Sequence, residues 1–330
     1  MIRPLREGTW HVTWRRFRRS TLATIALVYV AVVAAIALLA PLLASARPVA
    51  VHDGRGWHFP AVSDLLRGEI DRPYVVSPGA TYVLHAPVPF SPNGPDLAHR
   101  LTPPDALHRL GTDPLGRDVL ARTLHGARVS LAVALTATAI SLLVGAFFGA
   151  LAGYYGGAVD WIVSRAIEVV LCFPFLFLVL AIVAFFHPSL ATIIVALGFT
   201  SWTTEARYMR GELLRIRDAE FAQAARASGA RDVRIIFRHL VPNAIAPVLV
   251  SSSFNVAAAI LTESALSFLG LGVQLPMASW GSMLAIAEEY IDSGGWWLSA
   301  GPGTAIFVTV AAFNIIGDRF RDALDPRIES

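Results

Sequence analysis

The stretch VSLAVALTATAISLLVGAFFGALAG, residues 129–153, contains no charged side chain. An α-helix of about 20 apolar residues is long enough to cross a membrane. Gly145, Gly149 and Gly153 recur at four-residue spacing and therefore share one face of such a helix. Small residues at that spacing let helix backbones approach closely. The stretch predicts a membrane-spanning helix with a built-in packing face.

The whole composition agrees with a membrane protein. The chain has 330 residues, of which 55% are hydrophobic and only 15% charged, whereas soluble domains carry about 25% charged residues. The charges also fall in blocks between long apolar runs. Six spans are predicted, although Glu205 and Arg207 lie in the last turn of the fourth. The predicted spans are residues 22–43, 129–153, 161–186, 190–209, 244–262 and 296–317.

Two further segments are interpreted differently. Residues 264–286 are apolar but broken by Gly270, Gly272 and Pro276, so we expect an interfacial or re-entrant piece and no seventh span. The first apolar run, residues 21–46, follows a block of arginines and exceeds the 7–15 residues of a signal-peptide core, so we expect a retained span.

The distribution of arginine predicts the orientation. Six arginines precede the first span and eight lie in residues 207–238, whereas residues 263–295 contain none. Because cytoplasmic loops carry the excess of basic residues, both ends and the 207–238 loop are predicted to be cytoplasmic. Residues 46–128 contain nine arginines yet must lie outside, which is permitted because long loops translocate regardless of charge. Their proline, glycine and aromatic content predicts a small folded insertion, with a strand at residues 81–85.

Several kinds of chemistry are excluded. The chain has no lysine, and a P-loop needs a lysine to reach the terminal phosphates of ATP. The single cysteine, Cys172, allows no intrachain disulfide. His108, His125 and His187 lack metal-ligand spacing, and neither HExxH nor GxSxG occurs. We therefore expect no catalytic residue, no metal site and no nucleic-acid partner.

The segment DAEFAQAARASGARDVRIIFRHLVPN, residues 218–243, predicts a helix, a glycine turn and a second helix. Asp218 is the expected N-cap of the first helix and Gly229 its left-handed terminator. Asp232 is expected to cap the second helix, which Pro242 would end. The alanines make a slim helix suited to a groove on another protein. The alternative is a solvated loop whose arginines set topology or bind anionic lipid headgroups.

Some ionisable residues lie outside this loop. Arg165 and Glu168 are expected to form a local pair on the third span. Asp113, Arg117 and Asp118, which precede the second span, are expected to be structural. Glu263 is expected either to make a local contact or, together with Asn314, to line a translocation path.

The chain resembles a known family at several places. Gln223, Ala224, Ala225 and Gly229, with Leu240 and Pro242 downstream, are similar to the EAA loop of binding-protein-dependent ABC importer permeases. The stretches LGTDPLGRDVLARTLHGARVSL (110–131), GYYGGAVDWIVSRAIEVVLCFPFL (153–176), LSFLGLGVQLPMASWGSML (266–284) and FNIIGDRFRDALDPR (313–327) resemble the second permease of dipeptide and oligopeptide importers.

The resemblance implies an all-α polytopic membrane protein with the six-helix fold of type I ABC importer permeases and a long external loop after the first helix. The implied partners are a homologous second permease, two cytoplasmic ATP-binding subunits, an extracytoplasmic solute-binding protein and membrane lipid. ATP and magnesium would bind to the ATPases and no cofactor to this chain. The expected location is the bacterial inner membrane. The ATPase-coupling residues would be Gln223, Ala224, Ala225, Gly229, Asp232, Arg234, His239, Leu240 and Pro242.

The resulting layout divides the chain into a cytoplasmic tail, a first span, an external insertion, a permease core with its coupling loop, and a second cytoplasmic tail. These are residues 1–20, 21–45, 46–128, 129–318 with the loop at 210–243, and 319–330.

The sequence departs from the family pattern at two positions. Gln223 stands where the signature begins with glutamate, and Glu168 stands where aspartate is usual. Gln223 implies that docking depends less on a carboxylate and more on shape and the Gly229 turn. Rival hypotheses are a stand-alone channel or secondary transporter, which would show repeated halves, and an intramembrane enzyme. Peptides, nickel complexes and sugars all remain open as substrates.

Overall fold

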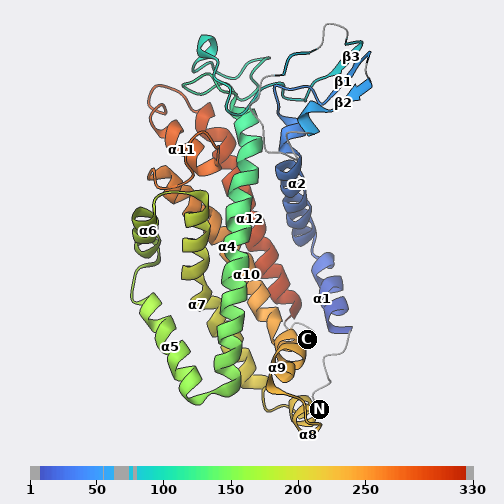
Figure 1. Ribbon diagram of the computed structural model, residues 1–330, viewed down its shortest axis with the longest axis vertical. Coiled ribbons are helices and arrows are strands. Elements are labelled where there is room, and N and C mark those ends of the chain that lie inside the picture. Colours follow the sequence, from blue (N-terminus) through green and yellow to red (C-terminus); the bar gives the residue numbers. More distant parts are fainter. Residues whose placement is uncertain (1–7, 55, 63–73, 77–79, 325–330) are drawn as a thin grey trace.

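The computed structural model describes residues 8–54, 56–62, 74–76 and 80–324, with side chains from residue 13 onward. Those residues form an elongated helical bundle (Figure 1). A short helix α1 (Gly8–Arg19) leads into α2 (Thr21–Leu43), and the long α4 (Val119–Tyr155) runs through the middle of the molecule. The described helices therefore agree with the predicted all-α class.

Helices occupy all six predicted segments. Within the described residues, three helices (α2, α4 and α12, Trp297–Leu324) and the continuous helical run Asp232–Phe268 are each long and apolar enough to cross a membrane. The third predicted span is instead two helices, α5 (Gly157–Leu171) and α6 (Phe175–Phe186), bent by 85°. Pro174 lies at this break. Proline breaks a helix because it lacks a backbone N–H and its ring clashes with the preceding turn.

The fourth predicted segment becomes α7 (Leu190–Ile216), which runs seven residues beyond the predicted end at 209. Its last turns hold charged residues, so it is the least apolar of the long helices. Glu205 is nevertheless fully buried, with Ser251 and Ser252 of α10 (Val241–Phe268) beside its carboxylate. Tertiary packing therefore extends this helix where hydropathy alone would end it.

The glycine face predicted on residues 129–153 packs α4 against α7. A β-carbon at Gly149 would lie 2.4 Å from the backbone oxygen of Ala206, and one at Gly153 would lie 2.8 Å from that of Arg210. Such distances leave no space for any side chain. The predicted packing face is confirmed, and α7 is its partner.

The insertion after α2 contains a three-stranded antiparallel sheet. Its strands are β1 (Ala50–Asp53), β2 (Gly56–His58) and β3 (Tyr82–Leu84), in the order β2-β1-β3. In the register, Val51 pairs with His58 on one side and Val83 on the other. The expected strand at 81–85 is confirmed as β3. The sheet lies at the upper end in Figure 1, and the short helix η1 (Leu97–His99) follows it in the chain.

The region between the fifth and sixth spans is an irregular loop followed by α11 (Trp280–Glu288), which lies at the same end as the sheet (Figure 1). Ser279 caps α11 in a capping box with Ser282. α11 packs against α4, α10 and α12. Its nine residues are too few to cross a membrane, which agrees with the expectation of no seventh span here.

Candidate functional site

The loop between α7 and α10 lies at the end of the bundle opposite the sheet (Figure 1). It consists of α8 (Glu220–Ala227), a tight turn, α9 (Asp232–Arg234) and a π-helical stretch η2 (Ile235–Leu240) that continues into α10. The predicted order of helix, glycine and helix is therefore present. α1 and the final turns of α12 lie toward the same end of the molecule.

Gly229 ends α8 in a left-handed conformation, with a φ of 76°. Its N–H donates to the carbonyl of Arg226, and the N–H of Ala230 donates to that of Ala225, the two bonds of a Schellman motif. Nothing lies within 4 Å of a β-carbon placed there. Glycine is needed for the backbone conformation and not for lack of space.

An apolar inner face attaches the loop to the bundle. Ala222, Ile235 and Leu240 are fully buried. They belong to one hydrophobic cluster with Met209 and Leu213 of α7. Because the anchors come from both halves of the loop, α8 cannot move without disturbing the ends of α7 and α10.

A polar brace joins the loop to α4. The Tyr154 hydroxyl donates to Asp232 Oδ1 at 2.7 Å, and the Arg226 guanidinium lies 5.4 Å from the Tyr154 ring centre. Arg226 also lies 3.6 Å from the Asp218 carboxylate. The hydrogen bond with the Tyr154 hydroxyl raises the pKa of Arg226 above its ordinary value. Arg226 therefore stays cationic and links α8 to the end of α4.

Two expected caps in this loop were wrong. The N-cap position of α8 is Ala219, with no side-chain hydrogen bond, whereas Asp218 pairs with Arg217 and Arg226. Asp232 is the first residue of α9 and not its cap, because its carboxylate accepts from Tyr154. Asp218 is thus engaged by an arginine beside it and one within α8, whereas Asp232 is engaged by Tyr154 of α4.

The sequence suggested that Pro242 ends the second helix, and this prediction was wrong. Pro242 lies in the first turn of α10, and the helical run continues to Phe268. Proline is tolerated there because the preceding residues form a π-helix. In a π-helix each backbone N–H bonds the carbonyl five residues earlier, so the hydrogen bonds around proline differ from those of a regular α-helix.

Gln223 makes a contact that glutamate could not make. Its Nε2 donates to the backbone carbonyl of Asp218 at 2.8 Å and so ties the first turn of α8 to the residues just before it. A carboxylate at this position has no proton to donate. The departure from the family signature is thus accommodated inside the loop.

The structure sorts the nine predicted coupling residues by exposure. Leu240 is buried, and Ala225 and His239 are half-buried. The other six are exposed and are Gln223, Ala224, Gly229, Asp232, Arg234 and Pro242.

Three exposed apolar residues on the same loop escaped the sequence analysis. Phe221, Val233 and Phe237 have exposed fractions of 39%, 65% and 44%. Val233 and Phe237 are four residues apart and so share a helix face, a spacing that could have signalled them. Exposed aromatic and aliphatic side chains ringed by arginines are typical of a protein-docking surface.

The two expected path residues lie apart from this loop, in α10 and α12. Glu263 is fully buried and accepts hydrogen bonds from Ser267 at 2.7 Å and Ser130 at 3.2 Å. Asn314 is half-buried on α12. In the described chain Glu263 is thus satisfied locally, and a role of either residue in the path stays a prediction.

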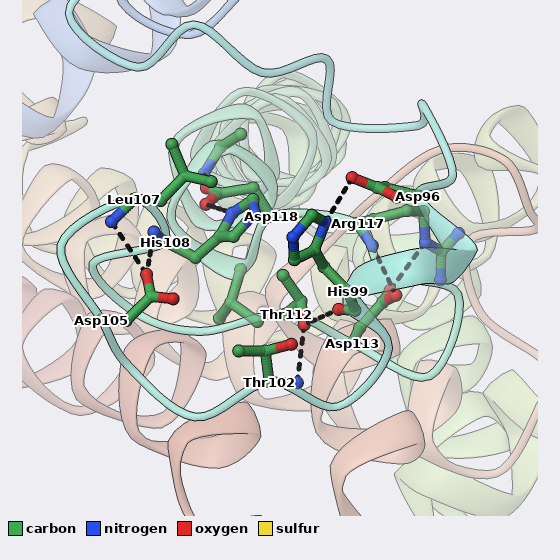
Figure 2. A network of polar contacts seen from close by, with 12 residues as sticks. Asp96, His99, Thr102, Asp105, Leu107, His108, Thr112, Asp113, Arg117 and Asp118 are labelled. Atoms are coloured by element: carbon green, nitrogen blue, oxygen red, sulfur yellow. Dashed lines mark hydrogen bonds and ion pairs between the residues drawn. The ribbon is translucent and has the colours of Figure 1, made fainter.

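The end of the bundle that holds the sheet also carries a network of polar contacts built from the segment before α4 (Figure 2). Asp118 caps α4 through the N–H of Ala121 and also pairs with His108 at 2.8 Å. Arg117 pairs with Asp113 at 2.6 Å. All four of the paired side chains are buried, which fits the expected structural role of Asp113, Arg117 and Asp118, and that role stays a prediction.

The rim of this network is exposed. His99 Nδ1 lies 2.8 Å from the Asp96 carboxylate, and this hydrogen bond lowers the pKa of Asp96. The backbone N–H of His108 likewise lowers the pKa of Asp105. Across the described ranges, no group of three or more His, Cys, Asp or Glu side chains is arranged to hold a metal ion.

Two parts of the chain match models of known protein families. Residues 145–330 match the model of the family described as binding-protein-dependent transport system inner membrane component. Residues 8–55 match the N-terminal transmembrane domain of oligopeptide transport permease C.

The chain is also similar to individual transport proteins. The chain is 45% identical over 232 residues to a dipeptide transport system permease protein of Bacillus subtilis, covering 70% of this chain and 72% of that protein. It is 38% identical over 248 residues to a di/tripeptide transport system permease protein of Pseudomonas aeruginosa, covering 73% and 82% respectively. A chain of the inward-facing MetNI methionine ABC transporter aligns with a TM-score of 0.49 and 19% identity, covering 62% and 97%.

Proposed function

Because the chain belongs to the family of binding-protein-dependent transport system inner membrane components, we propose that its α7–α10 loop docks a separate ATPase and transmits ATP-driven closure to the bundle. The chain is a multi-pass membrane permease subunit of an ABC importer. Such a subunit works with a partner permease and with ATPase subunits. Family membership supports this proposal over the stand-alone channel and the intramembrane enzyme.

One observation carries the docking proposal. The loop exposes Phe221 and Val233 in a segment that also holds four arginines, whereas Phe237 stacks on Phe147 of α4 at 6.3 Å. The loop's buried side chains Ala222, Ile235 and Leu240 fix it in the core with α7 and α10. A partner that binds the outer face therefore pulls directly on two membrane helices. Hydrolysis itself is assigned to the partner, since this chain has no lysine to build a P-loop.

We place the docking loop and both chain ends on the cytoplasmic side. The eight arginines of residues 207–238 and the absence of arginine from residues 263–295 support this orientation. The sheet and the polar network before α4 then face the outside. An extracytoplasmic solute-binding protein would deliver substrate there, and the layout of tails, insertion and core follows that given by the sequence.

The proposed substrate class is short peptides. The support is that the relatives named above are dipeptide and di/tripeptide transport permeases and that they align with about three quarters of their length. Uptake of labelled dipeptides by cells carrying the complete transporter tests this assignment. Uptake of a nickel complex or a sugar in place of peptide would contradict it.

The docking proposal is tested by Gly229→Val in the complete transporter. A β-branched residue in the left-handed region strains the backbone and should displace the turn after α8. ATPase retention on the purified complex should fall at least about tenfold, while membrane insertion is unchanged. Gly157→Val is the matched control, because Gly157 also has positive φ and open space but lies outside the loop.

A second variant separates docking from strain. Phe221→Ser together with Val233→Ser removes exposed apolar area without changing the turn, and should weaken ATPase retention in the same direction. Normal retention and peptide-stimulated ATPase activity in both the glycine and the serine variants would refute docking through this loop.

A further inference from the structure

A hollow lies between α1 and the final turns of α12. It has a volume of about 360 Å³ and is lined by Arg16, Phe17, Arg19 and Ser20 on one side and by Arg319, Asp322 and Ala323 on the other. Its walls are held by aromatic packing, because the buried Phe17 ring meets Phe320 edge-on at 6.2 Å. The hollow is thus part of the folded molecule.

A second hollow of about 390 Å³ adjoins the first and shares Arg319 and Asp322 with it. It extends to Leu22 and Ile315, which belong to the apolar parts of α2 and α12. Leu22 is 53% exposed. The pair of hollows therefore joins a charged rim to an apolar surface along the membrane-spanning helices.

The charge of the rim is positive. Arginines outnumber aspartates four to two over the two hollows, and one aspartate, Asp322, is engaged by Arg319 at 3.4 Å. The sequence of α1 contains no acidic residue at all. A monoanionic group bound between α1 and α12 would therefore meet a net cationic site.

The height of the site fits the membrane boundary. The apolar helix α2 begins at Thr21, directly after Arg19 and Ser20, and the charges of α12 begin at Asp318 after an apolar run. Trp14 is 47% exposed and stacks on Phe17 at 5.8 Å. Tryptophan and arginine at the end of a membrane helix are typical of the headgroup layer.

From these observations we propose that α1 and the end of α12 bind the headgroup of an anionic phospholipid, whose phosphate lies between Arg19 and Arg319 and whose chains follow Leu22 and Ile315. Juxtamembrane arginines attract anionic lipid by charge. Leu22 and Ile315 at the edge of the second hollow offer acyl chains an apolar contact that a free anion cannot use. The site would fix α1 to the membrane surface, next to the docking end of the bundle.

The test uses the purified complete transporter, stripped of lipid in a neutral detergent and titrated with phosphatidylglycerol or phosphatidylcholine while bound lipid is counted by native mass spectrometry. Phosphatidylglycerol should bind at least about fivefold more tightly. Arg19→Gln and Arg319→Gln should each lower its affinity by about fivefold, the effect of one arginine near an anionic surface. Arg15→Gln removes the same charge from an exposed position outside both hollows and should change affinity less than twofold.

Three results would overturn the proposal. Equal binding of the two lipids would exclude a charge-selective site, and an equal loss in Arg15→Gln would show diffuse attraction only. Displacement of the lipid by inorganic phosphate at about 0.01 M, where salt screens charges only beyond roughly 30 Å, would indicate a free-anion site. Loss of ATPase subunits in Arg19→Gln with unchanged lipid binding would assign the arginines to a protein contact. If a variant does not assemble, the unmodified transporter still decides, since phosphatidylglycerol and not phosphatidylcholine should raise its thermal midpoint.

Discussion

Replacing Gly149 with alanine tests a close contact between α4 and α7. The new β-carbon would lie 2.4 Å from the Ala206 backbone oxygen and 2.9 Å from Met209 Cβ. An ordinary carbon–oxygen contact needs about 3.3 Å, so α4 and α7 would have to separate by nearly 1 Å locally. Overpacking of this kind costs about 1–3 kcal/mol.

The control is Gly211→Ala on α7 itself. Gly211 is helical and exposed, and nothing lies within 4 Å of its would-be β-carbon. Both substitutions gain the same helix propensity of about 1 kcal/mol. The difference between the two variants therefore isolates the packing term.

Thermal unfolding of the purified transporter, followed by tryptophan fluorescence, measures this difference. Gly149→Ala should unfold about 2–6 °C below Gly211→Ala. The reasoning would be refuted if the two variants unfolded at the same temperature. Such a result would mean that α4 and α7 can separate at Gly149 without loss, and that the glycine face is not a rigid contact.

Three further predictions concern polar contacts. A double-mutant cycle on Asp160 and Arg210, which pair across α5 and α7 through two hydrogen bonds, should give a coupling free energy of about 1 kcal/mol by thermal unfolding; a value near zero would contradict a stabilising pair. Asp118→Ala removes the cap of α4 and the carboxylate that pairs with the buried His108 ring. The free energy of unfolding should therefore fall by about 2–4 kcal/mol. A fall below about 0.5 kcal/mol would show that water replaces the carboxylate. Gln223→Glu loses the bond to the backbone at the start of α8 and should destabilise the transporter by at most about 1 kcal/mol, with ATPase retention within about twofold; a large gain in retention would show that docking does require a carboxylate here.

The sequence was sufficient for features that depend on local composition. The apolar runs placed all six helical segments, because a membrane span must be long and uncharged whatever surrounds it. Gly229 was identified as the turn after α8, because a residue with positive φ after a helix is strongly restricted to glycine. The strand β3 also followed from the local composition of the insertion.

The sequence failed where one residue had a choice of partners. Asp218 and Asp232 are good helix caps by type, yet Asp218 pairs with Arg217 and Arg226, and Asp232 accepts from Tyr154 of α4. Pro242 reads as a stop signal, but the preceding π-helical winding lets the helix continue. Such choices depend on which elements meet in space, and local pattern carries no information about that.

The glycine face shows where the two sources of information divide. The four-residue spacing of Gly145, Gly149 and Gly153 determined that α4 has a packing face, because only the absence of side chains lets two helix backbones approach so closely. Only the tertiary structure decided that α7 fills it, and that Glu205 is buried at this contact. A spacing rule describes one surface of a contact, whereas the identity of the other surface depends on long-range packing of the whole bundle.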